Sequence, residues 1–263
     1  MRRWTFLLLT FLFFLLLCSC GEREAQLGKE GSAISNTEQQ ATQSTPREAA
    51  PRQAQETNLN AAKLLYMGQA SIRITTAQGK VIYIDPYAGD GYEPAADLIL
   101  VTHGHYDHND LDKVGNRNLS CQIITWQEAL EGGEHQTFDL GYATVQAVEA
   151  GYNRWHDVGE CVGYVVTLSD GISIYVTGDT STTEQMPLLA QQKIDYAFFC
   201  CDGVFNMDLE EAAECARLVG ASHNVPYHVL AQEGVYFDAE RAQQFNAPNR
   251  LVIDEGEEIV LTE

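Results

Sequence analysis

Basic residues are scarce in this sequence of 263 residues. Sixteen lysines and arginines stand against 37 aspartates and glutamates, which gives a formal net charge of −21 at neutral pH. The first 60 residues hold six of each sign, so the whole excess lies in the rest of the chain. A surface this acidic repels nucleic acid and anionic lipid headgroups. The sequence therefore predicts a protein that has no nucleic-acid partner.

Cysteines are few and irregularly spaced. There are seven, and the five beyond residue 20 are Cys121, Cys161, Cys200, Cys201 and Cys215. An odd number without a regular spacing does not fit a disulfide framework. Cys200 and Cys201 follow two phenylalanines, so we expect both to be buried strand residues that act as small apolar groups. A redox pair is the alternative interpretation of these two neighbours.

One long apolar run opens the chain. It follows two arginines and covers residues 4–17, about 14 residues against the ~20 that a membrane-spanning helix needs. This pattern is typical of an export signal, and a short transmembrane anchor is the alternative. The run ends in Leu17-Cys18-Ser19-Cys20, which resembles a bacterial lipobox. The resemblance implies cleavage before Cys20 and attachment of lipid to that residue.

Residues 21–60 contain no aromatic side chain and are rich in Gln, Glu, Ala, Ser and Thr. Such a segment buries too little apolar surface to offset the entropy lost on ordering it. We therefore expect a signal peptide over residues 1–20, a disordered tether over residues 21–60 and one domain over residues 61–263. The predicted location is the bacterial cell envelope, with the domain outside the cytoplasm and the lipid in the membrane.

Within the predicted domain, β-branched and aromatic runs bounded by Gly, Asp or Pro predict strands. They cover residues 64–66, 71–75, 80–85, 98–102, 121–124, 142–148, 163–167 and 173–177, with hairpin turns at 77–79 and 169–171. Helices are expected over residues 182–192 and 208–219. Asp208 suits the start of the second helix, and Gly220 suits its end. Hairpin strands with interspersed helices predict two sheets covered by helices.

Four potential metal ligands follow the apolar run 98–102 within six residues. They are His103, His105, Asp107 and His108. Imidazole nitrogen and carboxylate oxygen are preferred ligands of zinc and similar ions. At a strand end, His103 and His105 can point toward one ion, while Asp107 and His108 can face a second. This spacing predicts a two-metal site that activates water for hydrolysis.

The run resembles the first signature of the metallo-β-lactamase superfamily. Further similarity to this superfamily is carried by residues 66–71, 84–87, 96–103, 175–180 and 206–212. Together these motifs resemble the branch that includes ascorbate phosphate lactonases, over about residues 64–228. The resemblance implies an αββα sandwich and a metal-dependent hydrolase whose substrate the motifs do not specify.

The resemblance also implies a ligand set for each ion. His103, His105 and His156 would hold the first, while Asp107, His108, Asp179 and His228 would hold the second, with Asp179 between the two. Asn153 is the alternative to His156, because both lie in the segment where the third histidine is expected. His135 and His223 are expected to lie outside the site. Zinc suits this set best, and manganese and iron are alternatives.

The implied reaction is hydrolysis of a small ester, lactone or amide, with Asp107 orienting water and moving a proton. A phosphodiesterase or phosphatase of the same fold is an alternative, as is a lipid-anchored metal-binding protein without turnover. An iron redox site is a third alternative. Gln69 stands where relatives often carry histidine, so its role is open. Tyr152 and Arg154 are either substrate contacts or exposed loop residues.

Overall fold

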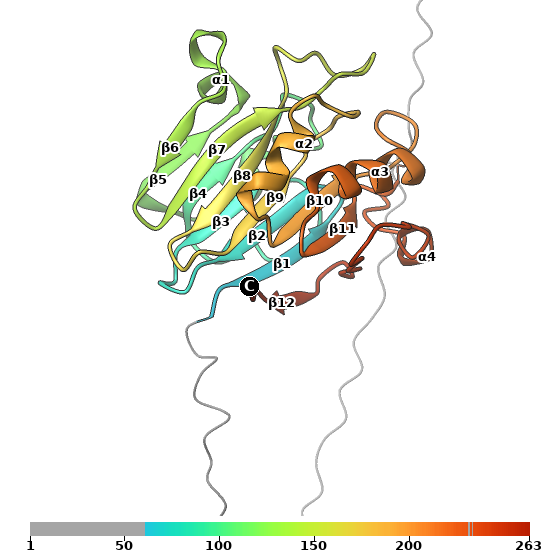
Figure 1. Ribbon diagram of the computed structural model, residues 1–263. Coiled ribbons are helices and arrows are strands. Elements are labelled where there is room, and N and C mark those ends of the chain that lie inside the picture. The colour runs from blue at the N-terminus through green and yellow to red at the C-terminus, as the bar shows by residue number, and fades with distance from the viewer. Residues whose placement is uncertain (1–60, 231, 233) are drawn as a thin grey trace, which may run out of the picture. The chain divides into compact units, whose positions relative to one another are not determined.

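The computed structural model describes residues 61–230, 232 and 234–263. The predicted signal peptide, the tether and the lipid attachment site at Cys20 lie outside these residues. The described part contains two six-stranded sheets that pack face to face (Figure 1). None of its helices combines the length and the apolar character that a membrane span requires.

Each sheet combines antiparallel hairpins with three parallel strands. The first sheet has the order β12 (Glu258–Val260), β1 (Lys63–Gly68), β2 (Ser71–Thr75), β3 (Val81–Ile84), β4 (Ala96–Leu100), β5 (Arg117–Ile124). The second has the order β11 (His223–Tyr227), β10 (Tyr196–Cys200), β9 (Ser173–Val176), β8 (Val162–Leu168), β7 (Ala143–Glu149), β6 (Thr137–Asp139). Strands β3–β5 run parallel to one another, and so do β9–β11. Their carboxyl ends are therefore gathered at one edge of each sheet, which is where ligands bind in sheets of this kind.

The main core lies between the sheets and follows the two-residue period of the strands. Ile72, Ile74, Ile82 and Ile84 of the first sheet belong to it, together with side chains such as Val166 of the second sheet. The intervening residues of the first sheet face outward and form a smaller cluster, which includes Leu65, Met67, Tyr83, Ile99 and Val101. Both faces of the first sheet are therefore covered.

Helices are short, and α3 is the longest of those described. They are α1 (Trp126–Ala129), α2 (Met186–Leu189), α3 (Leu209–Val219) and α4 (Ala239–Ala242), with 3-10 turns η1 (Leu111–Lys113), η2 (Glu131–Gly133) and η3 (Ala190–Gln192). Figure 1 shows α2 and α3 beside the second sheet, where α3 packs against β10. The predicted two-sheet sandwich is confirmed.

The predicted ends of α3 are also confirmed. The Asp208 carboxylate accepts hydrogen bonds from the backbone N–H groups of Glu210 and Glu211, and Gly220 ends the helix at φ +66°. The helix predicted over residues 182–192 was wrong at its start, because helical structure begins only at Met186. Pro187 fits the first turn of a helix and disfavours an earlier start.

The strand predicted over residues 98–102 ends at Leu100. The Asp85 side chain accepts the Thr102 backbone N–H at 2.8 Å, which removes that donor from the strand ladder. The chain then crosses to the second sheet, where Val162 N–H donates to the Thr102 carbonyl at 3.0 Å and His103 pairs with Cys161. Strands β6, β10, β11 and β12 are not among the predicted ranges, and two of them, β6 and β12, are only three residues long. The five cysteines in the described part of the chain form no disulfide bond, and Cys200 and Cys201 are buried as predicted.

Candidate metal centre

All seven predicted ligands come together at the strand ends. The run from His103 to His108 follows β4, Asp179 follows β9, and His228 follows β11 directly. His156 comes from the loop between β7 and β8. The site therefore draws on both sheets, and the two sets of parallel strands explain why residues so far apart in sequence meet.

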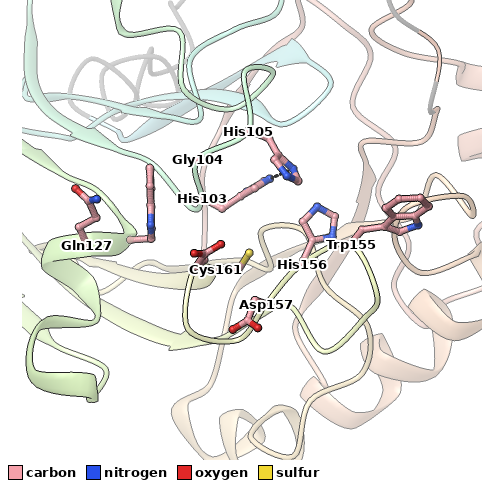
Figure 2. Close-up of a pocket in the computed structure, with 10 residues that line it drawn as sticks. His103, Gly104, His105, Gln127, Trp155, His156, Asp157 and Cys161 are labelled. Atoms are coloured by element: carbon pink, nitrogen blue, oxygen red, sulfur yellow. Dashed lines mark hydrogen bonds between the residues drawn. The ribbon is translucent and has the colours of Figure 1, made fainter.

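The three histidines assigned to the first ion form one compact group. Ring nitrogens of His103, His105 and His156 all lie within 4.8 Å of one another. His103 Nε2 and His105 Nδ1 face each other at 3.0 Å. Figure 2 shows these three rings converging, with Trp155 beside His156. His103 and His156 are buried, whereas His105 is exposed, so the group opens to solvent on one side.

A second group contains Asp107, His108 and His228, again within 4.8 Å. Asp179 lies between the groups. Its Oδ1 is 3.4 Å from His108 Nε2, and its Oδ2 is 3.4 Å from His156 Nε2 and 3.6 Å from His228 Nε2. The carboxylate thus faces histidines of both groups, as a bridging ligand would.

Three buried atoms of the candidate ligands lack a hydrogen-bond partner. They are His108 Nε2 and Asp179 Oδ1, which lie 3.4 Å apart, and His228 Nδ1. Leaving buried polar groups unpaired is costly, and such atoms call for a partner. Nitrogen and carboxylate oxygen are donors that suit zinc and related ions. The residues present therefore fit a divalent metal ion.

The charge state of the group also suits metal binding. Burial, together with the neighbouring His108, holds the pKa of His103 well below its usual value, and burial lowers the pKa of His156. Both rings are therefore neutral at neutral pH, which is the form that binds metal. Burial alone would raise the pKa of Asp179, but His228 and His108 outweigh it and hold that pKa well below its usual range. Asp179 is thus an anion.

His156 and Asn153 have different positions. Only His156 belongs to the group around the first ion. Asn153 instead accepts hydrogen bonds through Oδ1 from the backbone N–H groups of Trp155 and His156, at 2.9 and 3.0 Å. The same oxygen lies 3.1 Å from His156 Nδ1. Asn153 therefore orients His156, and His156 is the better candidate ligand.

Asp85 is a site residue to which the sequence assigned no role. It is fully buried at φ +46°, and its Oδ2 lies 2.9 Å from His108 Nδ1 and accepts the Thr102 hydroxyl at 2.7 Å. A carboxylate on the outer nitrogen of a ligating histidine fixes the ring orientation. The sequence signal for this role was its position directly after an apolar strand and before Pro86, because a buried aspartate is rarely without a partner.

Asp202 is a second such residue. Its Oδ2 is 3.7 Å from His228 Nδ1, while its Oδ1 accepts the backbone N–H groups of Val204 and Phe205. It follows β10 as Asp85 follows β3. Each metal-facing histidine of the second group therefore has a carboxylate on its outer side.

Gln69 contacts the second group directly. Its Nε2 donates to Asp107 Oδ2 at 2.6 Å and lies 3.4 Å from His228 Nε2. The backbone at Gln69 has φ +48° and is held by hydrogen bonds to Tyr236 and His228. Such a left-handed conformation is unfavourable for a residue with a side chain and persists only when its surroundings impose it. Gln69 thus fixes the direction of Asp107.

The remaining histidines lie elsewhere. His135 is exposed, and His223 stacks on Tyr196 with ring centroids 4.6 Å apart. Neither belongs to a candidate metal group among the described residues. Both expectations are confirmed.

Three cavities meet at the cluster. One of about 300 Å³ is lined by His103, Gly104, His105, Trp126, Gln127, Trp155, His156, Asp157, Glu160 and Cys161. A second of about 290 Å³ is lined by His105, Tyr106, Asp107, Trp155, His156, Asp179, Phe205 and His228. A third of about 60 Å³ lies on the side of Gln69. Tyr152 and Arg154 line none of the three.

Replacing Asp85 by asparagine is expected to weaken metal binding about 10–100-fold, the usual effect of losing an outer partner of a ligating histidine. Asparagine keeps the shape but loses the charge that holds His108. Competition with a chromophoric chelator measures the affinity. Asp97→Asn is the matched control, because Asp97 is a buried aspartate at the opposite end of β4. Equal affinities for the two variants would contradict the assigned role of Asp85.

Metal binding is expected to release protons near neutral pH. Burial lowers the pKa of His108, but Asp179 and Asp85 outweigh it and raise that pKa well above its usual value. The metal-free protein therefore carries a proton on His108, and an ion that takes Nε2 must displace it. Affinity should rise with pH until the pH exceeds this raised pKa.

Calorimetric zinc titrations at pH 7 in two buffers of different ionisation enthalpy measure the proton release. The apparent binding heats should differ between the buffers. His223→Ala should leave the difference unchanged, since His223 lies outside the cluster. Identical heats for the unmodified protein would contradict the assigned protonation of His108.

Comparisons with a family model and with individual relatives agree on the family that this chain resembles. A model described as beta-lactamase superfamily domain matches residues 63–228, a range that contains all seven candidate ligands. A UPF0173 metal-dependent hydrolase of Pyrococcus furiosus is 29% identical over 216 residues, covering 73% of this chain and 95% of the relative. One of Rubrobacter xylanophilus is 30% identical over 199 residues, covering 65% of this chain and 82% of the relative.

A solved structure shows the same fold. The metallo hydrolase Igni18 of Ignicoccus hospitalis superposes with a TM-score of 0.60 at 20% identity, covering 77% of this chain and 99% of that one. At this identity the similarity supports the αββα architecture alone.

Proposed function

We propose that this chain, which belongs to the metallo-β-lactamase superfamily and is a metal-dependent hydrolase, cleaves small carbonyl compounds with two divalent metal ions. The observation that carries the proposal is the position of Asp179, whose two oxygens face histidines of two separate groups. A single-ion site would not need this arrangement. The histidine-rich donor set makes zinc the proposed metal.

The candidate ligands would have two roles, metal binding and proton transfer. Two bound metal ions would supply a Lewis acid for the substrate oxygen and would make water an effective nucleophile near neutral pH. His103, His105 and His156 would hold one ion, and Asp107, His108 and His228 the other, with Asp179 shared. Asp107 also lines two of the cavities, so it can orient water and pass a proton to the leaving group.

The first test is the metal content. Elemental analysis of protein purified without added metal should find two ions per chain, or two should bind on titration. Protein that contains no metal and binds none would overturn the proposal. One ion per chain would overturn its two-metal part.

The second test is turnover. His105→Ala and Asp107→Asn should remove hydrolysis of a panel of esters, lactones and phosphodiesters. Unchanged hydrolysis in both variants would refute catalysis at this site. Turnover confined to phosphodiesters would refute the carbonyl substrate and leave the metal centre in place.

We also propose that the protein is lipid-anchored in the cell envelope through Cys20. The support is the sequence Leu17-Cys18-Ser19-Cys20 after an apolar run. Labelled palmitate should enter the full-length protein in bacteria and be absent from Cys20→Ala. Labelling of Cys20→Ala to the same extent would contradict this site.

A further inference from the structure

Three exposed aromatic side chains surround the metal centre. Tyr106 is 67% exposed, Trp155 47% and Phe205 40%. They come from three different loops, after β4, between β7 and β8, and after β10. Large apolar side chains that gather at an exposed site mark a binding surface more often than chance. We call these three residues the aromatic wall.

The wall faces the reacting centre. All three side chains line the cavity of about 290 Å³ that also contains Asp107, Asp179 and His228. Trp155 and Phe205 contact each other edge to face, with ring centroids 5.5 Å apart. An apolar group packed against these two rings would therefore lie next to the proposed position of the reacting carbonyl.

The size of the cavity limits this group. A cavity of roughly 150 Å³ is sufficient to hold benzene, and drug-sized ligands occupy upwards of about 300 Å³. The space beside the metal centre thus suits one ring or a short branched alkyl group together with a carbonyl.

Charge limits the substrate further. No lysine or arginine is among the described residues that line the three cavities, and Asp157 and Glu160 line the cavity beside His103 and Gly104. The nearby Arg154 lines none of the three, and its guanidinium stacks on the Trp155 ring at 4.6 Å. A phosphate or carboxylate outside the reacting bond would therefore meet no cationic side chain in the lining of the cavities, and the acidic residues of the neighbouring cavity would repel it.

We infer that the site takes small, uncharged carboxylic esters or lactones that bear an aromatic or short alkyl group, and that the aromatic wall binds this group. This inference rests on the proposed hydrolysis of carbonyl compounds. It excludes phosphorylated lactones as preferred substrates. The wall is a specificity determinant, whereas the bond is broken at the metal centre.

The test compares three ethyl esters on zinc-loaded, full-length protein. Ethyl phenylacetate carries a ring, ethyl acetate lacks one, and monoethyl succinate carries a negative charge. Burying one aromatic ring should raise kcat/KM for the phenylacetate about 10–100-fold over the acetate. Monoethyl succinate should be the poorest substrate of the three.

Variants assign the preference to the wall. Trp155→Ala and Phe205→Ala should each remove most of the advantage of the phenylacetate over ethyl acetate, measured as the ratio of the two kcat/KM values. Tyr152→Ala is the matched control, because Tyr152 is an exposed aromatic residue of the same loop that lines none of the three cavities. Trp155→Phe serves if the alanine variant does not fold.

A binding measurement separates the two proposals. Saturation-transfer NMR with phenylacetone, a neutral ketone that cannot be hydrolysed, reports occupancy of the wall without turnover. If no ester is hydrolysed but phenylacetone binds and loses affinity in Trp155→Ala, the proposed function fails and the wall is upheld. Equal rates for phenylacetate and acetate, unchanged by the variants, would overturn the wall while the function stands. Lack of both turnover and ketone binding would overturn both.

Discussion

Asp179→Asn should lower kcat/KM at least about 10²–10³-fold, the loss that follows removal of one well-placed electrostatic group from an active site. The larger part of the effect should come from the metals. Asparagine is neutral, and its amide nitrogen replaces either the oxygen that faces His108 or the oxygen that faces His156 and His228, so one of these two sides loses its carboxylate ligand. We expect the metal content to fall from two ions per chain to one or none, measured by elemental analysis after gel filtration.

The control for this variant lies near the opposite end of the same strand, β9. Asp170 is an exposed aspartate in the turn before β9, whereas Asp179 follows the other end of β9. Asp170→Asn should therefore keep both metals and full activity. If Asp179→Asn retains two ions and at least a third of its activity, the bridging role is refuted.

Gly178→Ala is expected to reduce the free energy of unfolding by roughly 2–5 kcal/mol, since it combines left-handed backbone strain with a steric clash. Gly178 has φ +62°, and a Cβ there would lie 2.6 Å from the Val162 carbonyl oxygen and 3.1 Å from Thr102 Cβ. The chain must then shift beside Asp179, so metal affinity should fall as well. Urea denaturation and the chelator competition measure the two effects.

Gly220→Ala separates strain from clash. Gly220 has nearly the same φ, +66°, but a Cβ there would meet no atom within 4 Å. It should lose only the strain contribution, about 1–2 kcal/mol, and no metal affinity. Equal losses of unfolding free energy in the two variants would show that the close contacts around Gly178 do not contribute to the destabilisation.

The sequence predicted the strands of the first sheet better than those of the second, in which β10 and β11 were not among the predicted ranges. Strands with strong β-branched periods, such as β2 and β8, were found nearly to their ends, since burial on one or both faces imposes the pattern. The start of α3 was found because Asp208 caps it. The three-residue strands β6 and β12 carry too few residues for a period, and their pairing depends on neighbours that are distant in sequence.

The residues of the site also differ in how well the sequence predicted them. The run from His103 to His108 was visible because its ligands are adjacent in sequence. Choosing between Asn153 and His156 required the loop conformation, in which Asn153 Oδ1 is already occupied by backbone donors. Asp85 and Asp202 could not be assigned because their role depends on contacts with histidines far along the chain. The roles of Gln69 and of the aromatic wall likewise depend on contacts between residues that are distant in sequence.

The pairing of His103 with Cys161 joins the two sheets at the metal centre. Because the ligands come from both sheets, no single hairpin or strand-loop segment holds a complete ion site. Binding energy at this place opposes separation of the sheets, as any ligand that binds only the folded state stabilises it. The metal supply of the surroundings would therefore set the lifetime of the folded protein as well as its activity.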